Sequence, residues 1–179
     1  FPKIMFTNSS AEYWRGDAAL IHTNIEDNSD APEHPNVRRY HFSGTQHGSG
    51  KYPLETVRES DSVRGNLPFN GINYTPILRG CLTNMNNWVK GENDPPPSSH
   101  PRHEDGSAIE TKDVIEKFSK IPGIRLPDRV LNPMRLDYGD EQHLGRTVKL
   151  PAENGETYPA FVSDVDETLN ATTGHLPPG

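Results

Sequence analysis

A histidine in a glycine-rich loop is the strongest candidate for chemistry in this sequence. Residues 37–50 read VRRYHFSGTQHGSG, in which an alternating β-branched and aromatic run, Val37–Ser43, opens into a loop that contains His47. Such a run favours a strand, and the glycines at positions 44, 48 and 50 favour a flexible turn after it. Loops that follow strands commonly carry reacting groups, and an imidazole titrates near neutral pH. We therefore expect His47 to act as a general base.

A general base of this kind needs a carboxylate that holds its tautomer and stabilises the imidazolium. Glu12 lies five residues after the first predicted strand, Lys3–Thr7, and we expect it to supply that carboxylate. Asp17, about one helical turn further along, is the alternative acid. The opposite interpretation is that Glu12 only favours the start of a helix and that His47 is an ordinary loop residue. Spacing alone favours this second interpretation.

The elements that must position these side chains follow a strand–helix–strand order. Lys3–Thr7 predicts a strand, and the polar run Asn8–Ser10 supplies oxygens that can cap a helix. Ala11–His22 predicts that helix, with Gly16 as its weak point. Val37–Ser43 is the next strand. This order is typical of a parallel sheet covered by helices, in which the carboxyl ends of neighbouring strands meet at one edge.

The clearest helix follows a polar segment, Lys51–Gly71, that we predict to be a long loop. Apolar residues recur at helical spacing across Tyr74–Lys90, with Pro76 in the first turn and Gly91 just past the end. The members of this apolar stripe are Ile77, Leu78, Cys81, Leu82, Met85, Trp88 and Val89. We expect the stripe to lie on the sheet beside the His47 loop.

The rest of the chain is rich in proline. Pro95–Pro97 predicts a stiff extended segment, Asp113–Phe118 a short helix, and Thr172–Gly179 a loose tail. Three short extended runs predict edge strands or hairpins: Met134–Tyr138, Arg146–Leu150 and Tyr158–Val165.

Composition excludes several classes of function. The chain has 179 residues, of which 31% are hydrophobic and 17 are proline, so we expect a modest core and much loop. Its formal net charge of −7, with dispersed Lys and Arg, gives no basic patch for nucleic acid. No run approaches the roughly 18 apolar residues of a membrane span. A single cysteine, Cys81, excludes an internal disulfide.

The sequence predicts no metal site and no cofactor. His100 and His103 lie in a proline-broken loop with no third ligand nearby, a pattern that favours a solvated loop. Asp164–Glu167 lacks the glycine and the distal glutamate of a calcium loop. The glycines before Lys51 lack the spacing of a phosphate-binding loop.

The ordered succession of several motifs resembles one family. KIMFTNSSAEYWRGDAALIHT is followed by NVRRYHFSGTQHG, NYTPILRGCLTNMNNWVKGENDPPPSSHPR, IPGIRLP, RLDYG and YPAFVSDVD. This succession is similar to the C-terminal half of the alpha/beta hydrolase domain-containing proteins, and it covers nearly the whole chain. In that fold the catalytic triad runs along the chain as Ser, then Asp or Glu, then His.

The resemblance implies an α/β fold class, namely the C-terminal part of an α/β-hydrolase fold with its last parallel strands and its closing helix. Residues 1–92 would be the C-terminal portion of the hydrolase core, and residues 93–179 a proline-rich extension with short strands packed on it. Glu12 and His47 would be the acid and base of an esterase-like Ser-Glu-His triad. The substrate would be a small-molecule ester or other acyl compound. Trp14 and Trp88 are most simply interpreted as core residues; the alternative, from their position beside Glu12, is that Tyr13 and Trp14 line an acyl pocket.

The nucleophile motif G-x-S-x-G does not occur in the 179 residues. We therefore expect a fragment that lacks the N-terminal half of the same domain and is inactive alone, while the full-length protein hydrolyses carboxylic esters. The alternative is a non-catalytic hydrolase-fold protein that binds a ligand or a partner. An upstream G-x-S-x-G between a strand and a helix would favour the enzyme.

Overall fold

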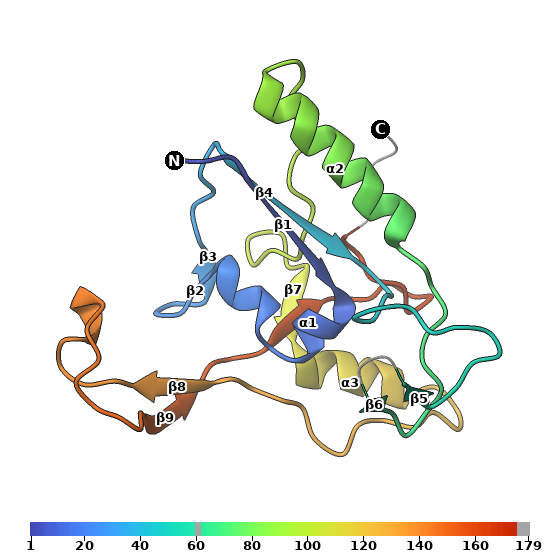
Figure 1. Cartoon of the computed structure of the whole chain (residues 1–179). Helices are drawn as coiled ribbons and strands as arrows, with labels where there is room; N and C mark the ends of the chain where they lie inside the picture. Colours follow the sequence, from blue (N-terminus) through green and yellow to red (C-terminus); the bar gives the residue numbers. More distant parts are fainter. Residues whose placement is uncertain (60–61, 175–179) are drawn as a thin grey trace.

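Two parallel strands form the centre of the fold. Figure 1 shows the computed structural model, which describes residues 1–59 and 62–174. β1 (Ile4–Ser9) and β4 (Val37–Phe42) pair in parallel, in register from Ile4 opposite Val37 to Ser9 opposite Phe42. Both strands were predicted, the first from its short apolar run and the second from its β-branched and aromatic residues. Because the pairing is parallel, the carboxyl ends of β1 and β4 lie side by side.

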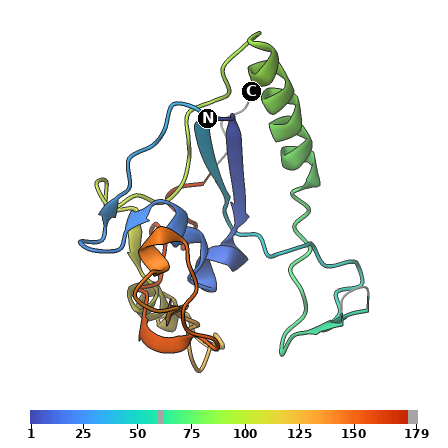
Figure 2. The same cartoon turned by 60° about the vertical axis from the view of Figure 1, so that its left-hand side comes forward.

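Helix α2 (Thr75–Lys90) covers one face of this pair (Figures 1 and 2). Its Cys81 packs with Tyr40 and Phe42 of β4 in an apolar cluster. The helix ends at Gly91, whose left-handed φ of 75° lets its N–H donate back to the last turn. The prediction of a helix here is confirmed.

The apolar stripe of α2 is wider than its contact with the sheet. Cys81 and Trp88 are buried, whereas the residues Ile77, Leu82 and Val89 are 37%, 70% and 63% exposed. The expectation that the whole stripe lies on the sheet is therefore wrong for these three residues, because the two-stranded sheet is narrower than the stripe.

The predicted helix Ala11–His22 is instead two short segments, α1 (Ser10–Trp14) and the 3₁₀ helix η1 (Ala18–Ile21). Between them, Gly16 takes a φ of +84°. A Cβ at that position would lie 2.7 Å from Pro133 Cδ and 3.0 Å from the Leu131 carbonyl oxygen. The helix breaks at Gly16, where a distant segment of the chain crosses too closely for any side chain.

A second apolar cluster joins α1 to the C-terminal part of the chain. Tyr13, Ala18 and Ala19 pack with Val114 and with Phe161. The partner elements are α3 (Thr111–Ser119), β7 (Ala108–Glu110) and β10 (Phe161–Ser163), of which β7 and β10 pair antiparallel. The short helix predicted at Asp113–Phe118 is confirmed by α3.

The other strands form small antiparallel pairs. β2 (Thr23–Asn24) pairs with β3 (Ser29–Asp30), and β5 (Val57–Arg58) with β6 (Val63–Arg64), so the predicted loop Lys51–Gly71 contains a short hairpin. β8 (Met134–Asp137) pairs with β9 (Glu153–Thr157), and the 3₁₀ helix η2 (Gln142–Leu144) lies between them in sequence. This β8–β9 hairpin projects from the rest of the molecule (Figure 1).

Two of the expectations for the C-terminal part are wrong. Arg146–Leu150 forms no strand, because the N–H groups of Val148 and Lys149 both donate to the Tyr138 carbonyl. In a strand, the N–H groups of successive residues point to opposite sides and cannot share one acceptor. Thr172 is not loose, because its N–H donates to the Asp164 carbonyl at 2.8 Å. Residues 175–179 of the predicted tail lie outside the described residues.

Candidate functional site

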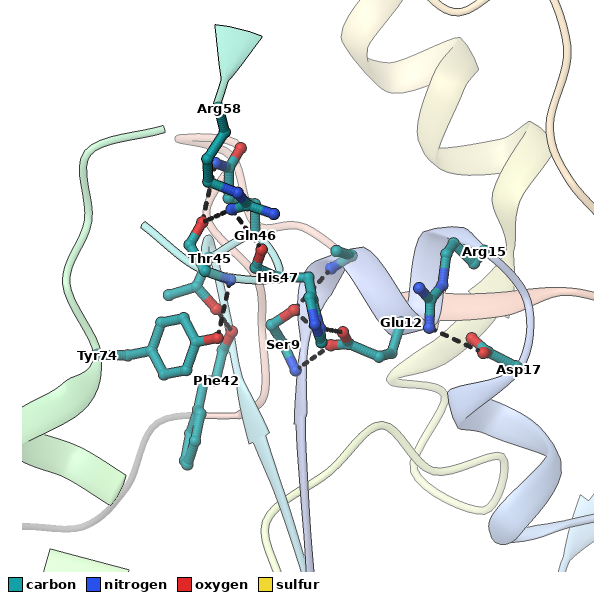
Figure 3. Close-up of polar contacts among 12 residues, drawn as sticks. Ser9, Glu12, Arg15, Asp17, Phe42, Thr45, Gln46, His47, Arg58 and Tyr74 are labelled. Carbon is teal, nitrogen blue, oxygen red and sulfur yellow. Dashed lines mark hydrogen bonds and ion pairs between the residues drawn. The ribbon is translucent and has the colours of Figure 1, made fainter. Parts of the chain in front are cut away.

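Glu12 and His47 meet at the carboxyl ends of β1 and β4. His47 Nδ1 lies 2.6 Å from Glu12 Oε1 (Figure 3). The register of the two strands brings about this contact, since Glu12 follows Ser9 and His47 follows Phe42, and those two residues are paired. With its Nδ1–H donated to the carboxylate, the imidazole presents Nε2 as its basic nitrogen. The His47 side chain is 72% exposed, so Nε2 is open to a reacting group.

The Glu12 carboxylate is held from its other side by Ser9. The Ser9 N–H donates to Glu12 Oε2 at 2.6 Å and the Ser9 hydroxyl also donates to it, while Ala11 N–H donates to Ser9 Oγ. This is the capping box that starts α1. Burial acts to raise the pKa of Glu12, but the hydrogen bonds from Ser9 and His47 outweigh it and hold that pKa below its ordinary value. Glu12 is therefore anionic at neutral pH.

Side chains distant in sequence fix the backbone of the His47 loop. Arg58 Nη1 donates to the carbonyls of His47 and Gly48 at 2.9 and 3.0 Å, and the Gly48 N–H donates to Tyr74 Oη at 3.1 Å (Figure 3). Gly48 has a φ of +81°, and a Cβ there would lie 2.7 Å from Arg58 Nη1. A groove of about 470 Å³ runs beside the loop and is also lined by Lys51. The loop backbone is thus fixed while the imidazole remains accessible.

A second group of contacts closes the base of the loop. Asn70 N–H donates to Gln46 Oε1, and Asn70 Nδ2 donates to the Gly44 carbonyl. Ser10 Oγ accepts from the Gly44 N–H at 2.9 Å and lies 3.1 Å from His41 Nε2. No local sequence pattern identifies Arg58, Gln46 or Asn70 as residues that fix this loop, because their contacts join segments that are distant in sequence.

Asp17, the alternative acid, has a different partner. Its carboxylate lies 3.0 Å from Arg15 Nη2, and both side chains are half exposed. In Figure 3 this pair lies beyond Glu12, on the side away from His47. The structure therefore brings Glu12 to His47 and leaves Asp17 with Arg15.

Tyr13 and Trp14 both line a cavity of about 140 Å³ on another face of α1. Its walls are mostly apolar and include Val114, Phe118 and Val162. The buried Tyr13 hydroxyl lies 3.1 Å from His22 Nε2, and burial raises the pKa of Tyr13, so the phenol stays neutral. Tyr13 and Trp14 thus form one wall of a small apolar cavity.

No group of three or more His, Cys, Asp or Glu side chains within residues 1–59 and 62–174 could hold a metal ion. In the same ranges, no helix has both the length and the apolar character to cross a membrane. His100 is not on a solvated loop as expected, because it is 8% exposed and its ring centroid lies 4.3 Å from that of His22. Its aromatic neighbour, which is distant in sequence, excludes solvent from it.

Comparison with protein families decides to which group the chain is related. A family model described as an alpha/beta hydrolase domain matches residues 2–166. The chain belongs to this alpha/beta hydrolase domain family. No curated protein and no solved structure matches the chain significantly. The mixed helices and strands, the small sheets and the parallel β1–β4 pair agree with the hydrolase-type α/β fold of the family.

Proposed function

We propose that this chain is the acid- and base-bearing C-terminal part of a serine hydrolase that cleaves a small carboxylic ester or a related acyl bond. The observation that carries the proposal is the 2.6 Å contact between His47 Nδ1 and Glu12 Oε1, with the imidazole otherwise exposed. Glu12 precedes His47 along the chain, which is the order of acid and base in this fold.

In the proposed reaction, a serine outside these 179 residues attacks the ester carbonyl. His47 Nε2 takes the proton from the serine hydroxyl and passes it to the leaving alkoxide, which departs as the alcohol. A water molecule then attacks the acyl-enzyme with the same histidine as base, and the carboxylic acid is released. Glu12 holds the imidazole and stabilises its charged form in both steps.

An incomplete sheet supports a nucleophile on another part of the same domain. Among the described residues β1 pairs only with β4, whereas the other edge of β4 is bound by Ser99, whose N–H donates to the Arg39 carbonyl. A further strand beside β1 would extend the sheet under the exposed part of the α2 stripe. The proposed boundary between core and extension at residue 92 falls just after Gly91, the C-cap of α2.

The cavity beside Tyr13 and Trp14 suggests the size of the acyl group. Cavities of about 150 Å³ with apolar walls hold a molecule the size of benzene. Gly44, which precedes His47 by three residues, lines this cavity as well. We propose that it receives a short apolar chain of the substrate.

The turnover of a p-nitrophenyl ester by the full-length protein tests the role of His47. His47→Ala should lower kcat by about 10²- to 10⁴-fold, because general base catalysis is lost. His143→Ala replaces an exposed histidine in η2 and should leave turnover unchanged. Unchanged turnover in His47→Ala would remove this histidine from the mechanism.

Glu12→Gln tests the acid separately. Glutamine keeps an oxygen for the Ser9 N–H, so the cap of α1 survives, but it cannot stabilise an imidazolium. We expect kcat to fall by about 10²- to 10⁴-fold with little change in KM.

A fluorophosphonate probe should label one serine of the full-length protein, and absence of any labelling would overturn the hydrolase proposal.

A further inference from the structure

Arg39 is a nearly buried cation on the central strand β4. It lies on β4 with only 8% of its surface exposed, on the face opposite Tyr40 and therefore away from α2. Its Nε has no hydrogen-bond partner among the described residues. Its ion pair is a long one, from Nη1 to Glu33 Oε1 at 3.9 Å. Buried guanidinium donors that remain unsatisfied are costly, so the geometry points to an acceptor bound from outside.

Arg39 lines a cavity that has room for such an acceptor. This cavity, of about 310 Å³, lies between the loop before β4 and the segment 97–104. Ser98, His100 and Arg102 form its other side. It shares no lining residue with the groove beside His47, so the two sites are separate.

Three carboxylates also line this cavity, but each is already engaged. Asp30 accepts the backbone N–H groups of His103 and Glu104, both at 3.0 Å. Glu104 Oε1 lies 2.6 Å from Arg102 Nη2, and Glu33 accepts from the Ser98 hydroxyl. Among the charged groups of the lining that the structure describes, Arg39 is the one with a buried hydrogen-bond donor, Nε, that has no partner.

We propose that this cavity binds a small monocarboxylate whose two oxygens accept a bidentate pair of hydrogen bonds from Arg39. A planar guanidinium matches the geometry of a carboxylate, and such charge-assisted pairs are strong. The lining carboxylates outnumber the lining arginines, so a doubly charged phosphate would be repelled more than a singly charged carboxylate. Burial lowers the pKa of His100, which leaves this imidazole neutral and without charge to favour phosphate.

Saturation-transfer NMR on the purified protein, with sodium acetate as the probe, tests this site. At constant ionic strength set with sodium chloride, acetate should give a saturable signal, and inorganic phosphate should bind more weakly. Arg39→Lys should weaken acetate binding about tenfold, because an ammonium group cannot form the bidentate pair. Arg79→Lys, which changes an exposed arginine on α2, should leave the affinity unchanged.

Glu33→Gln distinguishes a binding site from a merely structural arginine. It removes the negative charge 3.9 Å from Arg39, while its amide oxygen can still accept from Ser98. Acetate should therefore bind severalfold more tightly to this variant, a gain that a folding defect cannot produce. The proposal is overturned by the absence of a saturable acetate signal, by equal affinities in wild type and Arg39→Lys, or by tighter binding of phosphate.

Discussion

His22 is an ionisable side chain with almost no contact with solvent. It is 1% exposed, its Nε2 lies 3.1 Å from the Tyr13 hydroxyl, and its Nδ1 has no hydrogen-bond partner in the described part of the chain. Burial, and after it the nearby His100 and Arg39, lower the pKa of His22 to about 3, with Asp30 opposing them. The folded protein therefore holds this imidazole neutral.

Stability should consequently depend on pH through His22. In the unfolded chain the imidazole has an ordinary pKa of about 6.5, so between that value and pH 3 the unfolded state binds more protons. The stabilisation is fully present above about pH 6.5 and is lost as the pH falls toward 3. We expect the free energy of unfolding to drop by several kcal/mol over this range, measured by urea unfolding at neutral and acidic pH.

His22→Gln is the control for this pH dependence. Glutamine can still bond the Tyr13 hydroxyl but does not titrate, so the variant should be less sensitive to pH across the same range. Burial acts to raise the pKa of Asp30, but its hydrogen bonds from backbone N–H groups outweigh burial and lower that pKa. Protonation of Asp30 therefore also reduces the free energy of unfolding in acid. This loss occurs only below about pH 4, and it is the same in wild type and His22→Gln. Identical pH dependences for wild type and His22→Gln would contradict the assignment.

Among the elements, the break between α1 and η1 depends on one glycine. Gly16→Ala would place a methyl group 2.7 Å from Pro133 Cδ and 3.0 Å from the Leu131 carbonyl, at a φ of +84°. Because both the backbone conformation and the contact are unfavourable, we expect the free energy of unfolding to fall by about 1–3 kcal/mol. Thermal or urea unfolding measures this loss.

Gly80→Ala is the matched control within α2. A Cβ at Gly80 meets nothing within 4 Å, and the position lies in an exposed helix interior. The same substitution should there stabilise the protein by about 0.5–1 kcal/mol, because alanine favours the helix. Equal effects at positions 16 and 80 would show that the crossing segment does not cause the break.

Taken as a whole, the molecule leaves apolar side chains uncovered on α2 and an unpaired edge on β1. Leu82 and Val89 are exposed, and no described strand pairs with the other edge of β1. Uncovered edges and apolar stripes of this kind are places where another part of a protein packs. On the proposal that the rest of the hydrolase domain covers them, these residues are buried in the full-length protein.

Leu82→Lys should therefore act differently in two contexts. In the full-length protein we expect the free energy of unfolding to fall by about 2–4 kcal/mol, because a buried leucine is replaced by a charge. In the 179-residue chain, where Leu82 is exposed, the change should stay within about 0.5 kcal/mol. Asn86→Lys, at an exposed position of the same helix, should be neutral in both. A neutral Leu82→Lys in the full-length protein would contradict the proposed covering.

The local elements follow from short stretches of residues. β1, β4, α3 and α2 with its glycine C-cap follow from residue patterns within a few turns or a few strand residues, so they could be predicted. The contact between Glu12 and His47 was expected for a related reason, since parallel strands end at one edge, although the catalytic roles of these residues stay predictions.

The features that join distant segments became known from the folded structure. It placed Asp17 with Arg15 rather than with His47, anchored the His47 loop through Arg58, and broke a predicted helix where Pro133 passes Gly16. It also left the buried Nε of Arg39, beside a cavity, without a hydrogen-bond partner in the described part of the chain. Local sequence patterns do not predict these contacts. Most of them depend on the relative positions of groups that are tens of residues apart, and the pairing of Asp17 depends on which of several nearby charged side chains lies closest.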